Sequence, residues 1–284
     1  HVIMTKNATN FIHPITFETL TNNRCLVDTF DRNFEYNVEH VALAKKADVV
    51  LVAPATANVI AKLTYGLADD MLTTTVLACT CKKIVAPAMN TRMFQNSIVQ
   101  NNIENLRRND FEVINPDTGM LACKDVGEGK MPSEQVLLDH ILREIACKKD
   151  MAGMKVLVTA GPTMEAVDPV RYITNHSTGK MGYAVAKMCM LRGAQVTLVT
   201  GQTTVEKPPF VNVIDVKSAR EMFEAVTNCC QEQDIVVKAA AVADYRPQRV
   251  SSEKVKKSGE SMVLELEKTD DILQFLGEHK RPGQ

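Results

Sequence analysis

The stretch Ala47-Asp48-Val49-Val50-Leu51-Val52-Ala53-Pro54-Ala55-Thr56-Ala57-Asn58 decides the fold of the first half of the chain. Residues 49–53 form a continuous apolar run, which is typical of a strand covered on both faces. The pattern predicts that a helix follows from Asn58 to Leu67 and ends at Gly66 or just after it. A buried strand that leads directly into a helix indicates a parallel sheet with helices on both faces.

The same alternation continues on both sides of this stretch. After the short polar segment 148–153 the pattern restarts, which places a domain boundary near residue 152. We therefore predict an α/β protein with two doubly wound, Rossmann-like domains and mostly parallel sheets, residues 1–150 and 154–284. The further strands are expected at 83–86, 111–114, 155–159, 195–199 and 234–241, and the further helices at 97–109, 134–147, 180–192 and 271–276.

The sequence also predicts a chain that is cut at both ends. The first unit begins at Val2 and Ile3, which should be a second strand, with no preceding strand, glycine turn and helix. The second unit ends on a helix-like segment while its sheet is unfinished.

Composition limits the classes of partner. The 284 residues include 33 basic and 34 acidic side chains, for a net charge of -1. This balance argues against nucleic acid or a membrane surface as the main partner. No stretch approaches the roughly 18 apolar residues of a membrane span, and the start of the chain lacks the pattern of a signal peptide.

The 8 cysteines are scattered, without a CxxC pair or a Cys/His zinc spacing, so a reducing cytoplasm is the expected setting. Most of them are expected to be small buried hydrophobic residues. Cys123 differs, because the run 121–132 (LACKDVGEGKMP) surrounds it with glycines and charged side chains. These surroundings are compatible with a reactive thiol. The alternative is an ordinary surface loop with a chance cysteine.

Polar residues follow the expected strands of the first half. In open α/β sheets, ligands lie beyond the carboxyl ends of the strands, and those ends carry Thr5, the run 54–58 and the run 87–90 (Pro-Ala-Met-Asn). Thr56 and Asn58 could hold a phosphate at the start of a helix. They could equally do no more than cap that helix.

His40 lies in a segment, 38–44, that is expected to be helical. A lone histidine on a helix is more often structural. With a pKa near 6.5, such a side chain could also exchange a proton at neutral pH.

Three motifs of the first half, PATAN at 54–58, PAMN at 87–90 and LACKDVGEGKMP at 121–132, resemble the flavin-dependent cysteine decarboxylases, and among them those that act on phosphopantothenoylcysteine. The resemblance implies His40 and Cys123 as catalytic residues. It implies flavin mononucleotide (FMN) as the cofactor, held by Thr5, Thr56, Asn58 and Ala88. The substrate-binding residues it implies are Met89, Asn90, Ala122, Gly127, Gly129, Lys130 and Met131, of which the last four would form a loop that closes over the substrate.

The chemistry implied by this resemblance is an oxidative decarboxylation. The thiol end of the substrate is oxidised with FMN as the acceptor, and the thioaldehyde formed lets the adjacent carboxylate leave as carbon dioxide. Hydride then returns to the ene-thiolate, and Cys123 supplies a proton.

A second candidate site lies in the other half. The run 175–182 (NHSTGKMG) places hydroxyls, a glycine and a lysine at the start of a helix, which suits an anion. It matches neither the Walker A motif nor GxGxxG. Asp244 follows the expected strand at 234–241, and lysines follow at 254–257. The lysines are either a solvated basic run or the cations that a nucleotide triphosphate with Mg²⁺ requires.

The motifs AGPT, NHSTGKMG, AAAVADYRP and KVKK occur in this order and resemble the phosphopantothenate–cysteine ligases. The resemblance implies that CTP activates the carboxylate of 4'-phosphopantothenate as an acyl-cytidylate, from which the amine of cysteine displaces CMP. Asn175 then holds the acyl-cytidylate, Ala240 and Ala241 line the nucleotide pocket, and Lys254 steers the triphosphate. Asp244 is the acid of the nucleotide site and the candidate ligand of Mg²⁺.

Together the motifs predict a bifunctional enzyme of coenzyme A synthesis with 4'-phosphopantothenate, cysteine and CTP as small-molecule substrates. The resemblance implies a homo-oligomer, with trimers formed through the decarboxylase half and dimers through the ligase half. Two alternatives stay open: a non-catalytic flavin-binding regulatory protein of the same fold, and an inert fragment of the enzyme.

Overall fold

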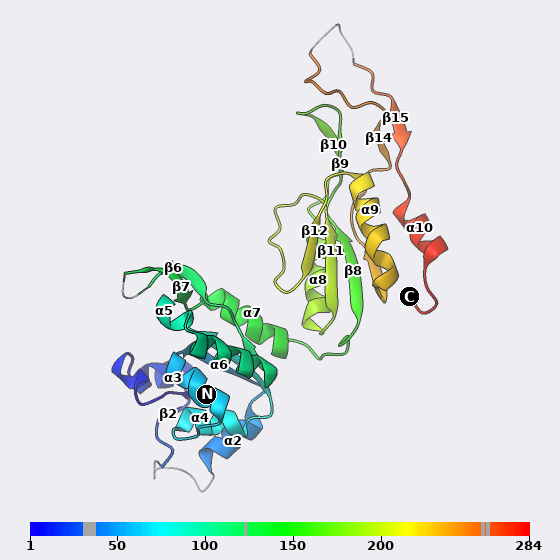
Figure 1. The fold of residues 1–284 in the computed structure, drawn as a ribbon. Coiled ribbons are helices and arrows are strands. Elements are labelled where there is room, and N and C mark those ends of the chain that lie inside the picture. Colours follow the sequence, from blue (N-terminus) through cyan, green and yellow to red (C-terminus); the bar gives the residue numbers. More distant parts are fainter. Residues whose placement is uncertain (31–37, 122–123, 257–258, 260–261) are drawn as a thin grey trace. The chain divides into compact units, whose positions relative to one another are not determined.

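The computed structural model describes residues 1–30, 38–121, 124–256, 259 and 262–284 (Figure 1). The chain forms two compact units, His1–Ile145 and Ala146–Gln284, and each is described by itself. The central sheet of each unit is parallel, and helices cover it, so the predicted α/β class is confirmed. None of the described helices combines the length and the apolar character that a membrane crossing requires.

The first unit is built on a parallel sheet in the order β3-β4-β5. A separate parallel pair joins β1 to β2. These strands are β1 (Val2–Ile3), β2 (Cys25–Leu26), β3 (Val49–Ala55), β4 (Lys82–Pro87) and β5 (Phe111–Val113). The helices are α1 (Pro14–Thr21), α2 (Glu39–Lys46), α3 (Ala57–Tyr65), α4 (Met71–Ala78), α5 (Thr91–Phe94), α6 (Ser97–Arg108) and α7 (Glu134–Ile145), with a short 3-10 turn η1 (Ala8–Asn10).

Both faces of this sheet are buried, as the apolar run at 49–53 predicts. Val52 and Val85 pack on one face with Ile60 of α3 and Leu106 of α6. Ile84 packs on the opposite face in a cluster that includes Leu137 of α7. Side chains alternate between the faces of a strand, so a strand covered on both sides needs an apolar residue at nearly every position.

Local signals define the helix that follows β3. The side chain of Thr56 accepts a hydrogen bond from the backbone N–H of Val59 at 3.3 Å, which caps the start of α3. Gly66 ends the helix in the left-handed conformation, with a φ of 68° that glycine adopts at little cost. The helix therefore begins at Ala57 and ends close to the predicted glycine.

The strands β6 (Asp117–Met120) and β7 (Val126–Lys130) pair as an antiparallel hairpin. The sequence analysis expects a loop here. Gly127, Gly129 and Lys130 instead lie in a strand, and Met131 follows directly after it. The hydrogen bonds of the hairpin, rather than an alternating apolar pattern, stabilise these strands.

The second unit contains a parallel sheet in the order β12-β11-β8-β13. Its strands are β8 (Lys155–Ala160), β11 (Gln195–Thr200), β12 (Asn212–Asp215) and β13 (Ile235–Lys238). The strand expected over 234–241 thus ends at Lys238. Residues 239–241 continue beside the end of β8, where the N–H of Ala239 donates to the carbonyl oxygen of Thr159 at 3.2 Å, into the turn in which Ala241 makes a single bridge with Pro162.

Helices cover both faces of this second sheet. Val158 of β8 packs with Ala186 and Met190 of α8 (Lys180–Leu191). Leu157 faces the other way, toward α9 (Ala219–Cys229) and α10 (Ile272–His279). Figure 1 shows α8 and α9 on either side of the sheet. The 3-10 turn η2 (Cys230–Glu232) follows α9 directly.

Two antiparallel hairpins complete the second unit. The first pairs β9 (Met164–Ala166) with β10 (Tyr172–Thr174), and the second pairs β14 (Tyr245–Pro247) with β15 (Leu266–Lys268). Both follow strands of the parallel sheet, β9 after β8 and β14 after β13. They therefore extend from the sheet edge at which ligands bind in folds of this class.

Candidate functional site

The first candidate site lies at the carboxyl ends of β3 and β4. The backbone N–H of Ala88 donates to the carbonyl oxygen of Ala55 at 2.9 Å, which joins the two turns that follow these strands. Thr56 is exposed at the start of α3, and Asn58 is the second residue of that helix and is also exposed. The structure therefore brings Thr56, Asn58 and Ala88 to one edge of the sheet.

The β6–β7 hairpin packs against the turn at 88–91. The backbone N–H of Met89 donates to the carbonyl oxygen of Gly129 at 3.0 Å. A Cβ on Gly129 would lie 2.2 Å from the carbonyl oxygen of Met89, and one on Gly127 would lie 2.4 Å from the hydroxyl of Thr91. Both contacts are shorter than any real Cβ allows, so this approach requires glycine at both positions.

Asn90 serves as a structural cap in this turn. Its Oδ1 accepts a hydrogen bond of 2.9 Å from the backbone N–H of Arg92, which starts α5. The side chain is half-buried. An amide side chain also carries an N–H₂ group, which suits an acceptor such as a carboxylate.

Two further predicted residues of this half, Thr5 and His40, come from other elements. Thr5 follows β1, whose sheet makes no ladder with β3 in the described part of the chain, and its hydroxyl accepts from the N–H of Ala8 at 3.2 Å. His40 is half-buried in the first turn of α2, which packs against α4. Ala122 and Cys123 lie outside the described residues.

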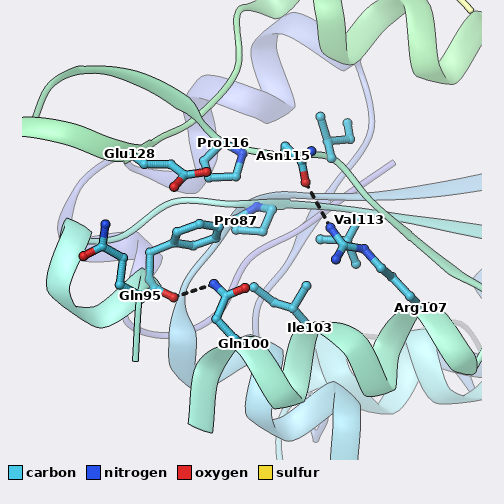
Figure 2. Close-up of a pocket in the computed structure, with 11 residues that line it drawn as sticks. Pro87, Gln95, Gln100, Ile103, Arg107, Val113, Asn115, Pro116 and Glu128 are labelled. Atoms are coloured by element: carbon cyan, nitrogen blue, oxygen red, sulfur yellow. Dashed lines mark hydrogen bonds between the residues drawn. The ribbon is translucent and has the colours of Figure 1, made fainter. Parts of the chain in front are cut away.

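A cavity of about 360 Å³ adjoins the turn and the hairpin (Figure 2). Pro87 and Phe94 form part of its apolar wall. Its polar lining includes Glu128 of β7, Gln100 and Arg107 of α6, and Asn115, whose Oδ1 accepts from the Arg107 guanidinium at 3.0 Å. This cavity could not be predicted from the sequence, because its wall comes from five separate elements with no shared motif.

Thr91 is a second feature that the sequence analysis missed. Its Oγ1 is buried and has no hydrogen-bond partner among the residues that the structure describes. A buried hydroxyl without a partner is unfavourable. The only sequence signal is its place directly after the PAMN motif.

The second candidate site lies at the carboxyl ends of β8, β11 and β13. A Cβ on Gly201, which follows β11, would lie 1.9 Å from the carbonyl oxygen of Pro162, which follows β8. Gly161 and Gly179 both have positive φ, 74° and 75°, and their backbones approach each other closely. These glycines allow three turns to meet where larger residues would separate them.

Asn175 and Thr163 hold the turn after β13 in place. The Nδ2 of Asn175 donates to the carbonyl oxygens of Ala241 and Val242, at 3.3 and 3.1 Å. Buried Thr163 accepts from the N–H of Ala243 through its Oγ1 at 2.9 Å. The structure thus brings Asn175 against the backbone of Ala241, with Ala240 as the neighbour of Ala241.

Asp244 and Lys254 have exposed side chains in the described part of this unit. Asp244 lies at the end of the 239–244 turn, where its carbonyl oxygen accepts from the N–H of Thr269 at 3.0 Å. Lys254 lies in a segment that contacts the β9–β10 hairpin through its neighbour Val255. Among the described residues no three His, Cys, Asp or Glu side chains come together as a metal site would require.

Known protein families match both halves of the chain. The Flavoprotein family matches residues 1–146, and the family described as DNA/pantothenate metabolism flavoprotein, C-terminal domain, matches residues 151–284. The coenzyme A biosynthesis bifunctional protein CoaBC of Bacillus subtilis is 44% identical over 285 residues, which cover 99% of this chain and 70% of that protein. The protein of the same name from Escherichia coli is 39% identical, with 96% of this chain and 68% of that protein covered.

Solved structures match each half separately. The C-terminal domain of a protein CoaBC is 48% identical, and the match covers 46% of this chain and 61% of that chain with a TM-score of 0.41. The FMN-dependent cysteine decarboxylase SpaF is 34% identical, with 48% and 73% covered and a TM-score of 0.42.

Proposed function

The chain belongs to the flavoprotein family that includes the coenzyme A biosynthesis bifunctional proteins CoaBC, and from this premise we propose that it acts in coenzyme A synthesis with two activities. The second unit joins 4'-phosphopantothenate to cysteine with CTP. The first unit decarboxylates the conjugate to 4'-phosphopantetheine. The identity of 44% extends over 99% of the chain, and this single observation carries the proposal, because it includes both sets of motifs in family order.

The first site has the features that FMN needs. The start of α3 directs backbone N–H groups outward beside the Thr56 hydroxyl, and such a helix start stabilises a phosphate. Ala88, whose N–H donates to the carbonyl oxygen of Ala55, is half-buried and presents a small side chain that leaves room for a flat ring. FMN would supply the two-electron chemistry at the thiol end of the substrate, which no side chain can perform. Thr5 and Asn58 complete the proposed flavin set.

The protein's own residues bind the substrate and control protons in this proposal. The amide N–H₂ of Asn90 binds the carboxylate that departs as carbon dioxide, while its oxygen stays on the Arg92 N–H. The hairpin carrying Gly127, Gly129 and Lys130 covers the reacting end and excludes water. Cys123 returns a proton to the product, and His40 stabilises charge. Met89, Ala122 and Met131 complete the proposed substrate contacts.

In the second unit, the turn at 239–244 is the proposed nucleotide pocket. Ala240 and Ala241 leave space for the base or ribose, and Asn175, whose amide already fixes this turn, lies at its edge to hold the acyl-cytidylate. Lys254 neutralises the triphosphate. Because the described residues contain no three-ligand metal site, we propose that Mg²⁺ arrives with the phosphates of CTP and uses Asp244 as its protein ligand.

We further propose that the protein works as a homo-oligomer, with trimers through the first unit and dimers through the second. His40 lies on α2, the helix that packs against α4, and in this proposal a neighbouring copy brings it to the turn at 88–91. Large apolar side chains such as Phe11, with 91% of its surface exposed, also favour association.

The proposal is tested by mass spectrometry of products after incubation with phosphopantothenate, cysteine, CTP, Mg²⁺ and FMN. We expect 4'-phosphopantetheine. The undecarboxylated conjugate alone would contradict the activity of the first unit. If no conjugate forms, synthetic phosphopantothenoylcysteine with FMN tests the first unit directly. A flavin spectrum without turnover of either substrate would favour the non-catalytic flavin-binding alternative.

A further inference from the structure

The segment that carries Lys254 is fixed at its base to the β9–β10 hairpin. The backbone N–H of Ser251 donates to the carbonyl oxygen of Val167 at 3.1 Å. The N–H of Val255 donates to Oδ2 of Asp168 at 3.1 Å, and its carbonyl oxygen accepts from the Arg171 guanidinium at 2.7 Å. Both backbone groups of the residue after Lys254 are therefore held by one Asp–Arg pair.

Asp168 is the centre of this arrangement. Its carboxylate is fully buried, and the residue is 3% exposed. Oδ1 accepts from the N–H groups of Val170 and Arg171 at 2.8 Å each, and Oδ2 accepts from Nε of Arg171 at 2.9 Å as well as from Val255. The Arg171 guanidinium and these N–H groups hold the pKa of the carboxyl well below its usual range, despite burial.

This geometry differs from that of an ordinary surface ion pair. Asp150 and Arg192 also form a bidentate pair in this unit and join residues 42 positions apart, but both side chains are 43% exposed to solvent. Asp168, by contrast, joins residues that are 87 positions apart in the sequence. A long lysine side chain has many rotamers, so fixing its backbone restricts where its charge can lie.

We propose that Asp168 is a positioning residue for CTP use, which holds the backbone on which Lys254 reaches the triphosphate. This inference rests on the proposed role of Lys254 and adds a residue for which the motifs gave no role. Asp168 does not touch the nucleotide. It acts through the backbone of Val255. The partly exposed Arg171 binds both Asp168 and the carbonyl oxygen of Val255.

The test compares four variants by ligase kinetics: Asp168→Asn, Lys254→Gln, the double variant and Glu165→Gln. Asparagine keeps the shape of Asp168 but places an N–H₂ group against N–H donors. Glu165→Gln is the matched control, because Glu165 is equally buried in β9 at 3% and binds the N–H of Ala219 in α9 rather than the Lys254 segment. Thermal unfolding is measured for each variant, and cleavage by trypsin after Lys254 is measured for the two variants that keep this lysine.

We expect Asp168→Asn to raise the KM for CTP about tenfold and to change the KM for cysteine less than about twofold. The double variant should be no worse than Lys254→Gln alone, since both changes act on the same contact. Cleavage after Lys254 should be faster in Asp168→Asn and unchanged in Glu165→Gln.

Three results would overturn the inference. First, the increases in the KM for CTP caused by Asp168→Asn and by Lys254→Gln could multiply in the double variant. Second, Asp168→Asn could lower kcat to the same extent as Glu165→Gln and leave the KM for CTP unchanged. In either case Lys254 retains its proposed role and only the positioning role fails. If Lys254→Gln itself leaves the KM for CTP unchanged, the assignment of Lys254 fails, and the positioning role fails with it.

Discussion

The backbone N–H of Met89 and the carbonyl oxygen of Gly129 form a 3.0 Å hydrogen bond, which joins the turn after β4 to the β6–β7 hairpin. Gly129 is buried and has a φ of 137°, a conformation that other residues rarely adopt. The PAMN turn and the glycine-rich run therefore form one structural unit. This contact supports the proposal that the hairpin covers the substrate held by Asn90.

Gly129→Ala should disrupt this contact. The new Cβ would meet the carbonyl oxygen of Met89 at 2.2 Å, and the backbone conformation itself costs a side-chain-bearing residue about 1–3 kcal/mol. We expect the hairpin to move away from the turn and decarboxylation to fall by about 100-fold or more. Formation of the phosphopantothenate–cysteine conjugate should be unchanged. Both rates are measured in the same preparation.

The matched control is Gly119→Ala, in the same hairpin. Its Cβ would meet only the flexible Cδ of Lys130, at 3.3 Å, and its φ is not positive. This variant should retain decarboxylation within about threefold. Equal losses of decarboxylation in the two variants would show that any side chain added to the hairpin lowers the rate. The Met89–Gly129 contact would then have no special role.

Cys123→Ser tests the residue that the sequence singles out and that lies outside the described residues. A serine hydroxyl is a far weaker acid than a thiol, so it should fail to deliver the final proton. We expect ligation and the loss of carbon dioxide to continue and the flavin cycle to stop before product release, with the oxidised ene-thiol visible by mass spectrometry. Normal 4'-phosphopantetheine formation would refute the assignment of Cys123 as proton donor.

Thr163→Val should weaken the ligase site from a buried position. Oγ1 of Thr163 accepts from the N–H of Ala243 at 2.9 Å, and valine would leave that N–H unpaired at a cost of about 1–3 kcal/mol. We expect a lower melting temperature of the second unit and weaker use of CTP, because the 239–244 turn loses its support. Thr163→Ser keeps the hydroxyl and should restore CTP use. Equally weak use of CTP in Thr163→Ser, which keeps the hydroxyl, would contradict the role of the Thr163 hydroxyl.

The central elements of both units could be predicted from the sequence, because their signals are local. The apolar run at 49–53 requires a strand covered on two faces, and Gly66 ends the following helix as predicted. The bounds predicted for the helix at 180–192 likewise agree with those of α8 to within one residue. In each case burial and capping depend on residues that are neighbours in the sequence.

The hairpins could not be predicted in this way. The strand β7 reads Val-Gly-Glu-Gly-Lys and has no alternating apolar pattern, so it depends on the hydrogen bond between Met89 and Gly129 across 40 positions of sequence. The same limit applies to the residues of the candidate sites. Motifs indicated Thr56, Asn90 and Asn175, whereas the role of Asp168 follows only from its contacts with Val255 in space.

Acid should weaken the first unit through Glu112 of β5, which contacts His140 and Arg143 of α7. Burial raises the pKa of this carboxyl, but the hydrogen bond from His140 and the charges of Arg143, His140 and Lys82 outweigh it, so the pKa lies below its ordinary value of 4.5. A carboxyl whose pKa is lower in the folded state stabilises the fold above its unfolded pKa, and that contribution is lost as the pH falls through the folded pKa.

Glu112→Gln should therefore lower the melting temperature of the first unit at pH 7 and bring it closer to that of the unaltered protein near pH 3. Calorimetry of the full chain from pH 7 to 3 measures this, with the exposed Glu104→Gln of α6 as the control that should change little at any pH. A difference between Glu112→Gln and the unaltered protein that stays constant across this range would mean that the Glu112 charge does not contribute to the anchoring of α7.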